Sequence, residues 1–241
     1  MLTYSKIDHI KFKEYLEIKD EPWNIENILV KKTRKYTKFI KNIPWIKMVA
    51  IWNSVAMNYA TKESDIDLFI ITSKNRLWLV RVLTTLIFSA LWLRKTSKSH
   101  AWKFCLSFFV TTDWMNLWDF AIENDIYLYF WMIYLKPIIN YNNAYENFIN
   151  LNRSWADFTE FEDIIENNKW FVKYEWNSIW DWLKTLDFID KILKFLLQSR
   201  AIKKYEQLWK PYWIVIWKNI LKFHDDDKRV EFREKILANE E

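Results

Sequence analysis

Two aspartates one residue apart, Asp65 and Asp67, have a spacing suited to binding a metal ion. Successive side chains of a strand point to opposite faces, so residues i and i+2 project from the same face. The apolar run 66–71 predicts a buried strand, and both carboxylates then lie together near its start. Two carboxylates in that arrangement are typical ligands of a hard cation such as Mg²⁺. We therefore expect Asp65 and Asp67 to be metal ligands with a catalytic role.

A polar turn precedes this pair and is suited to binding phosphate. The apolar run 46–51 predicts a strand, and Trp52, Asn53 and Ser54 follow it as a turn that enters a short helix over 54–60. The start of a helix has free backbone N–H groups and the positive end of the helix dipole, both of which attract phosphate. We expect this turn to bind the β- and γ-phosphates of a nucleotide. A metal site beside a phosphate site predicts nucleotidyl transfer.

This succession of strand, turn and paired aspartates resembles the nucleotidyltransferase superfamily that includes DNA polymerase beta. Members have Gly-Ser or Gly-x-Ser after the first strand and Asp-x-Asp on the next. The Asn-Ser turn and the Asp-Ile-Asp motif match in type and spacing, whereas Trp52 stands at the glycine position. The resemblance is clearest over residues 44–136, where the runs 75–81 and 104–109 are similar to a bacterial subgroup.

The resemblance implies an α/β (α+β) fold, with a small mixed sheet of the nucleotidyltransferase type, helices around it and a mainly helical C-terminal region. It also implies an enzyme that uses Mg²⁺ to move a nucleoside monophosphate from an NTP, expected to be ATP, to a hydroxyl. RNA, a protein side chain and a small molecule remain open as the acceptor.

A third acidic residue, which active members of that superfamily carry on a neighbouring strand, is missing from the expected position. The apolar run 104–110 has no acid, and Cys105 and Ser107 take its inward positions. Asp113 follows this run and is the candidate for the third catalytic carboxylate. The alternative is a catalytically weak binding module, as antitoxin-like members of the superfamily are. A third carboxylate within about 4–6 Å of the pair, the range of direct charge coupling, distinguishes the two.

The amino-acid composition suggests that many tryptophans stand in the place of glycine. The 241 residues contain no Gly and 17 Trp, although glycine averages about 7% and supplies the positive φ of turns and helix ends. Several tryptophans lie in turn-like sequence, as in Pro44-Trp45 and the polar run 176–182. Some bacteria read the codon UGA as glycine, whereas another common code reads it as tryptophan. Our hypothesis is that most of these tryptophans are glycines in the cell, and a UGG codon at Trp52 would refute it.

Charge and cysteine content favour a cytoplasmic protein with an anionic partner. The net charge of +5 is spread along the chain and favours nucleotides or RNA only weakly. The single Cys105 cannot form an internal disulfide, which fits a reducing compartment, and the first residues lack the pattern of a signal peptide. The apolar run 76–93 approaches the roughly 20 residues of a membrane span. Because Arg81 and hydroxyl residues interrupt it, we expect a buried helix and no membrane.

Three regions are expected along the chain. Residues 1–43 form a helical extension, whose basic helix is better explained as a solvated face than as an RNA-binding one. Residues 44–136 form the nucleotidyltransferase core, and Pro137 marks the start of a region of helices. That region, 137–241, contains the strongest amphipathic helix of the tail at 185–205, a late strand at 212–216 and a closing helix at 226–237.

Other candidate metal ligands are weaker. The run His224-Asp225-Asp226-Asp227 has metal-binding residue types, but one His beside three Asp is more often the charged start of a helix. One Cys and three scattered His argue against zinc.

Overall fold

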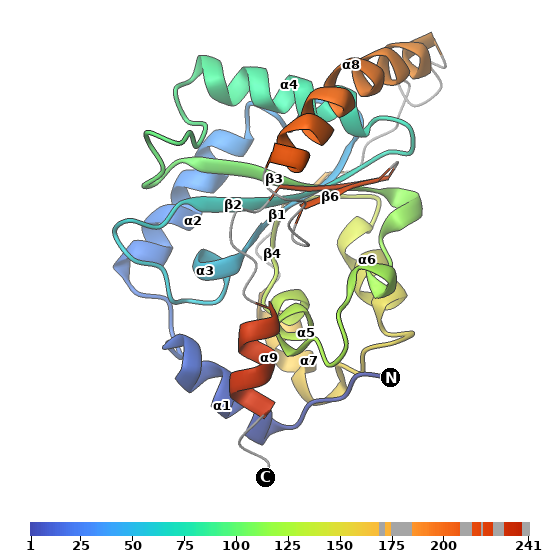
Figure 1. The fold of residues 1–241 in the computed structure, drawn as a ribbon. Coiled ribbons are helices and arrows are strands. Elements are labelled where there is room, and N and C mark those ends of the chain that lie inside the picture. Colours follow the sequence, from blue (N-terminus) through green and yellow to red (C-terminus); the bar gives the residue numbers. More distant parts are fainter. Residues whose placement is uncertain (169–171, 175–184, 208–213, 218, 224–228, 238–241) are drawn as a thin grey trace.

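The computed structural model describes residues 1–168, 172–174, 185–207, 214–217, 219–223 and 229–237. Within these residues the chain is an α/β protein, in which helices cover both faces of one seven-stranded mixed sheet (Figure 1). The strand order is β5-β4-β1-β2-β3-β7-β6.

The strands are β1 (Ile46–Trp52), β2 (Ile66–Thr72), β3 (Phe104–Thr111), β4 (Lys136–Tyr141), β5 (Val172–Tyr174), β6 (Ile214–Ile216) and β7 (Ile220–Phe223). The α-helices are α1 (Lys6–Leu16), α2 (Asn24–Thr37), α3 (Asn53–Ala56), α4 (Leu77–Ala90), α5 (Ile126–Ile133), α6 (Ala144–Asn152), α7 (Glu162–Asn167), α8 (Thr185–Gln207) and α9 (Arg229–Leu237). Three short 3₁₀ helices are η1 (Thr112–Trp114), η2 (Trp118–Phe120) and η3 (Thr159–Phe161).

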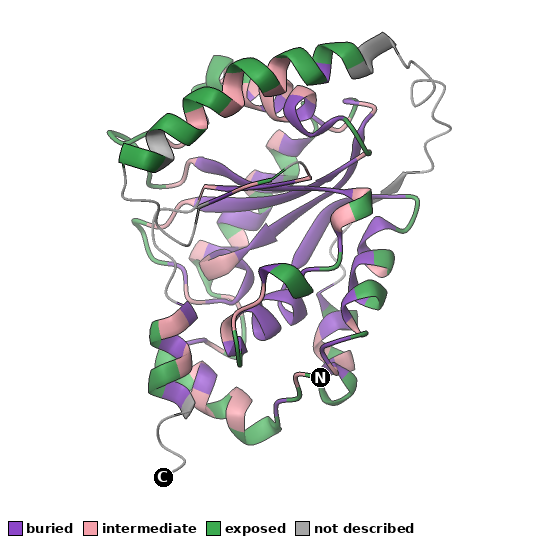
Figure 2. Ribbon diagram, turned by 45° about the vertical axis from the view of Figure 1, so that its right-hand side comes forward, coloured by how far each residue is buried: buried purple, intermediate pink, exposed green. Residues whose placement is uncertain are grey.

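Three central strands place the predicted site residues side by side. β1 pairs with β2 in antiparallel fashion, so that Trp52 lies opposite Asp67. β2 pairs with β3 in parallel fashion, so that Asp67 lies opposite Cys105. These three residues therefore form a row across the sheet. Every residue of the three strands is buried, as expected of strands covered on both faces (Figure 2).

Each face of the sheet has its own hydrophobic core. One core contains Trp52, Phe69 and Phe108 of the sheet and is covered by α1, α5, α6 and α9. The other contains Leu68 and Phe104 and is covered by α2 and α4. Because strand residues alternate, Asp67 belongs to the first face, together with Trp52 and Phe69.

The predicted α/β class and the central strands are confirmed. The apolar run 76–93 forms α4, which packs on the sheet, and the structure contains no described helix that is long and apolar enough to cross a membrane. The helix predicted at 185–205 is α8, and the predicted late strand and closing helix coincide with β6 and α9 where those residues are described.

The region after residue 135 contains more strand than its sequence indicated. β4 was expected to be helix or loop because Pro137 ends the preceding helical pattern. Proline is tolerated in a strand at a bulge, and the register of β4 on β1 shifts beside Pro137, between Val49 and Ala50. The expected boundary at Pro137 thus falls inside β4. The polar run 176–182 lies outside the described residues. β5 and β7 extend the same sheet as β4.

Two tryptophans have the left-handed backbone conformation that favours glycine. Trp92 (φ 56°) and Trp102 (φ 62°) are unusual because bulky residues avoid this region. Trp92 follows the C-cap of α4, where its N–H donates to Ser89 O and the N–H of Leu93 donates to Phe88 O. This is the Schellman arrangement, whose left-handed residue is usually glycine. Trp52 is different, because its φ is −137° and imposes no strain; Asn53 has the positive φ instead.

Three buried tryptophans have indole N–H groups without a hydrogen-bond partner among the described residues. They are Trp45, Trp78 and Trp131. Buried indole N–H groups usually find a partner.

His9 fixes α1 against the aromatic core. Its ring stacks on Phe130, contacts the edge of Phe161 and forms a 2.7 Å hydrogen bond with the hydroxyl of Tyr134. Burial and, next, the charge of Lys13 lower the pKa of His9 to about 4. The native protein therefore keeps this imidazole neutral in weak acid.

We expect His9 to make the fold less stable in acid. The unfolded chain protonates His9 near pH 6.5 and the native chain only near pH 4, so stability is lost as the pH falls through this window. Since the ring is partly exposed, the loss is reduced to about 1–2 kcal/mol. Urea unfolding of the chain and of His9→Gln at pH 7 and pH 4.5 measures it. Equal pH dependence of the two proteins would contradict the assignment.

Candidate functional site

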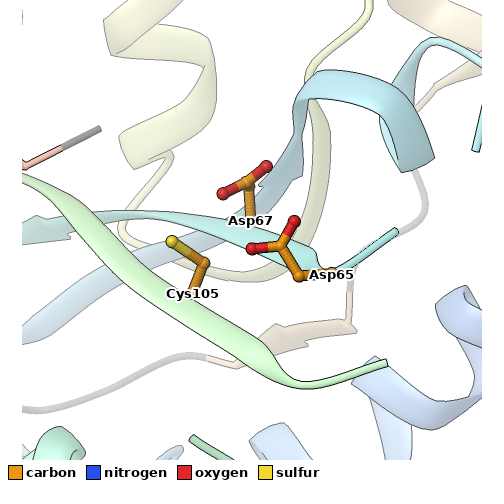
Figure 3. Close-up of side chains that lie close together, drawn as sticks. All are labelled: Asp65, Asp67 and Cys105. Atoms are coloured by element: carbon orange, nitrogen blue, oxygen red, sulfur yellow. The ribbon is translucent and has the colours of Figure 1, made fainter. Parts of the chain in front are cut away.

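Asp65, Asp67 and Cys105 converge at the start of β2. One carboxylate oxygen of each aspartate and the Cys105 sulfur lie within 4.8 Å of one another. Figure 3 shows the three side chains gathered between the neighbouring strands β2 and β3. The predicted pairing of Asp65 and Asp67 follows from their i, i+2 spacing, whereas Cys105 joins them through the parallel register of β3. Asp67 and Cys105 are buried and Asp65 is half-buried.

Asn53 links the polar turn to the carboxylate pair. Its side-chain amide donates to Asp67 Oδ2 at 3.0 Å. The carbonyl oxygen of the same side chain accepts hydrogen bonds from the hydroxyls of Tyr59, at 3.0 Å, and Tyr127. These contacts fix which way the Asn53 amide faces and thereby hold the Asp67 carboxylate in place. Neither tyrosine was predicted as a site residue. Tyr59 lies six positions along the chain from Asn53, whereas Tyr127 reaches it from 74 positions away through the tertiary fold.

Lys95 supplies a cation to the pair. Its ammonium nitrogen lies 2.8 Å from Asp65 Oδ2. Burial disfavours the charged ammonium, but the hydrogen bond and the charge of Asp65 outweigh burial and raise the pKa of Lys95 above its ordinary value. One positive charge therefore faces two carboxylates, and a negative charge remains to be balanced.

Cys105 is a protonated thiol in the absence of a cation. Burial, followed by the negative charge of Asp67, raises its pKa well above the usual range. The side chain of Ser107, which is 4% exposed, acts on the pKa of Cys105 in the opposite direction and favours the thiolate. The Ser107 hydroxyl forms no hydrogen bond with any described residue.

The helix after the turn is shorter than predicted. A helix over 54–60 was expected, but α3 is the single turn Asn53–Ala56. Asn58, with a φ of 59°, ends the helical path. One turn of helix has only a small dipole, so α3 alone is a weak phosphate site.

A cavity of about 500 Å³ adjoins the turn on the same face of the sheet. Its lining includes Trp52, Asn53 and Ser54 from the predicted phosphate site. Aromatic side chains form much of the remaining wall, and two cations, Lys222 of β7 and Arg229 of α9, also line it. This volume lies within the range of small-molecule sites. Nothing in the local sequence around positions 222 and 229 indicated this role, since the sheet order brings them there.

Arg229 is itself anchored beside the cavity. Its guanidinium donates to Asp125 Oδ2 at 3.0 Å and to Phe120 O at 3.0 Å, and it lies 4.2 Å from the centre of the Phe120 ring. Lys222 approaches the same ring, with its nitrogen 5.0 Å from the centre. Both cations therefore lie close to the Phe120 ring.

Asp113 is not brought to the pair. It follows β3 at the end where Thr111 lies opposite Thr72, whereas Asp67 lies near the other end of β2. The five residues from Asp67 to Thr72 span about 17 Å of strand. Asp113 accepts a hydrogen bond from Thr111 at 2.5 Å and pairs with Lys74 at 3.4 Å. In the described part of the chain the third donor beside Asp65 and Asp67 is Cys105.

The run His224-Asp225-Asp226-Asp227 lies outside the described residues.

The chain matches no family model, and no curated protein and no solved structure shows significant similarity to it.

Proposed function

We propose that this protein binds a nucleoside triphosphate with a divalent cation and transfers its nucleotidyl group to a hydroxyl, with release of pyrophosphate and the hydroxyl proton. The observation that carries the proposal is the hydrogen bond from Asn53 to Asp67, which joins the carboxylate pair to a turn that lines a 500 Å³ cavity. Asn53 thus joins the proposed metal ligands to the wall of the cavity. This juxtaposition is what a metal–nucleotide complex requires.

The cavity suits a nucleotide better than a purely apolar ligand. Tyr127 and Phe232 stack with their centres 4.9 Å apart and form one aromatic wall, against which a base can pack. Lys222 and Arg229 contribute positive charge for the phosphates. We place the base among the aromatic side chains and the triphosphate toward Ser54 and the carboxylates.

The two carboxylates fit Mg²⁺, which is commonly held by one or two carboxylates together with substrate phosphates. When bound by Asp65 and Asp67, the ion would neutralise phosphate charge and help align an acceptor hydroxyl. Asn53 would keep Asp67 oriented throughout, and the aromatic wall would exclude water from the base. We propose ATP as the nucleotide. The acceptor of its nucleotidyl group is RNA, a protein or a small molecule.

A second function is favoured by the thiol at the third position. Cys105 in its protonated form is a poor proton acceptor, and Lys95 already neutralises part of the charge of Asp65. Both features suit a module that binds nucleotide and transfers it slowly. The two functions differ in turnover and share the same site.

Labelled nucleotides separate these functions. The chain, and a variant with glycine restored at Trp52, would be incubated with Mg²⁺, cell extract and ATP labelled on either the α- or the γ-phosphate. We expect an acceptor to take up the α-label and not the γ-label, and the Asp65→Asn/Asp67→Asn double variant to lose this transfer. Tight binding without transfer would favour the binding module. Absence of both binding and transfer would refute both functions.

A further inference from the structure

The donor set beside β2 differs chemically from a set made for Mg²⁺. Mg²⁺ takes oxygen ligands in an octahedral arrangement at about 2.0–2.1 Å. Here two carboxylates are joined by the sulfur of Cys105, all within 4.8 Å. Sulfur is a soft ligand that selects zinc-like ions over Mg²⁺.

We propose that Asp65, Asp67 and Cys105 form a three-ligand site for Zn²⁺, which the free protein binds in preference to Mg²⁺. Open zinc sites have three protein ligands and a fourth position for water or substrate. Two donors bound to one tetrahedral ion at about 2.1 and 2.3 Å are about 3.6 Å apart, so the side chains must move together by up to about 1 Å to close the set. The sequence argued against zinc because only Cys and His were counted; here two carboxylates supply the other ligands.

Charge balance supports a divalent ion at this position. The carboxylates of Asp65 and Asp67 and a Cys105 thiolate carry three negative charges, and the ammonium of Lys95 contributes one positive charge. A divalent cation makes the group neutral, which a buried site requires. On binding, the sulfur forms a bond to the ion, and the thiol proton leaves to solvent.

The neighbouring hydroxyl gives independent support. Ser107 is 4% exposed, and its hydroxyl has no hydrogen-bond partner in the described structure. It lies two residues from Cys105 on β3, and its influence on the thiol favours the thiolate. A hydroxyl that donates to a metal-bound thiolate is the kind of outer partner that orients a ligand. A carboxylate at position 105 would suit Mg²⁺, whereas here a sulfur lies near a buried hydroxyl that has no hydrogen-bond partner among the described residues.

Cobalt titration without nucleotide tests the proposal. Co²⁺ reports a thiolate ligand through a charge-transfer absorption in the near ultraviolet. We expect this absorption to reach its maximum at one Co²⁺ per chain, and Zn²⁺ but not millimolar Mg²⁺ to abolish it. Cys105→Ser should remove the absorption and weaken Zn²⁺ binding by at least about 10–100-fold. Loss of a residue that only hydrogen-bonds to a metal ligand already has an effect of that size. Cys105→Asp should remove it too and shift the preference toward Mg²⁺ and Mn²⁺.

His224→Ala is the matched control and should leave the absorption and the Zn²⁺ affinity unchanged. Circular dichroism of each variant establishes that the fold is retained. Cobalt binding without the absorption, or equal Zn²⁺ affinity of the chain and Cys105→Ser, would overturn the proposal. The site shares two residues with the proposed function, but this titration contains no nucleotide, so either can fail without the other.

Discussion

Asp67→Asn and Asp65→Asn will each lower the affinity for Mg·ATP by more than about 100-fold. Loss of a residue that only hydrogen-bonds to a metal ligand lowers metal affinity by about 10–100-fold, and loss of a ligand itself should lower it further. Asp67 is 2% exposed and is held by Asn53, so the neutral amide takes the same place without the metal-binding charge. Burial of an amide costs less than burial of a charge, so the unfolding free energy should change by no more than about 1 kcal/mol. Calorimetric titration with Mg·ATP and thermal unfolding measure the two effects.

Asp113→Asn provides the matched control for that prediction. Asp113 is a carboxylate of the same size that is exposed and hydrogen-bonded, and it follows the opposite end of β3. We expect its substitution to leave Mg·ATP affinity within twofold of the parent, a difference of about 0.4 kcal/mol. Equal losses for Asp113→Asn and Asp67→Asn would mean that general charge, rather than a metal site, governs binding.

Trp52→Gly will raise the affinity for Mg·ATP at least tenfold, about 1.4 kcal/mol. The indole lines the cavity beside Asn53 and Ser54, where it occupies space that phosphates need. Its ring packs edge-on against Phe108 and Trp131, so its removal enlarges the cavity and costs about 3–5 kcal/mol of stability. Titration with Mg·ATP and urea unfolding test both effects, and Trp52→Ala is a second variant should the glycine form fail to fold.

Trp92→Gly is the control that separates backbone strain from obstruction of the site. Trp92 is 84% exposed and left-handed, so glycine there should stabilise the chain by about 1–2 kcal/mol and leave nucleotide affinity unchanged. Glycine at Trp176 or Trp180, outside the described residues, should likewise act on stability. Equal Mg·ATP affinity of the chain and Trp52→Gly would contradict the phosphate-binding role of the turn.

Local patterns predicted the parts of the site that are local in the sequence. The pairing of Asp65 with Asp67 follows from strand alternation alone, and the hydrophobic runs located β1, β2 and β3. Cys105 was noted as an inward residue, but its place beside Asp67 depends on the register of parallel strands. Asp113 was expected beside the carboxylate pair because it follows β3 closely in the sequence. It follows the end of β3 that lies about 17 Å from Asp67 along the strand.

The remaining parts of the site depend on contacts distant in sequence. Tyr127 reaches Asn53 across 74 positions of the chain. Lys222 and Arg229 line the cavity because β7 pairs with β3 and α9 packs beside α5. Single-sequence patterns contain no information on such pairings. β4 was missed for a different reason, since Pro137 normally ends regular structure and here lies beside a bulge.

Photoaffinity labelling with 8-azido-ATP tests most directly whether a nucleotide occupies the cavity next to the carboxylate pair. With Mg²⁺ present, mass spectrometry should locate the label on peptides that contain Tyr127 or Phe232, and excess ATP should prevent it. The Asp65→Asn/Asp67→Asn double variant should lose most of this labelling. Labelling of the basic face of α2, or labelling of the cavity peptides that is unchanged in the double variant, would contradict the account.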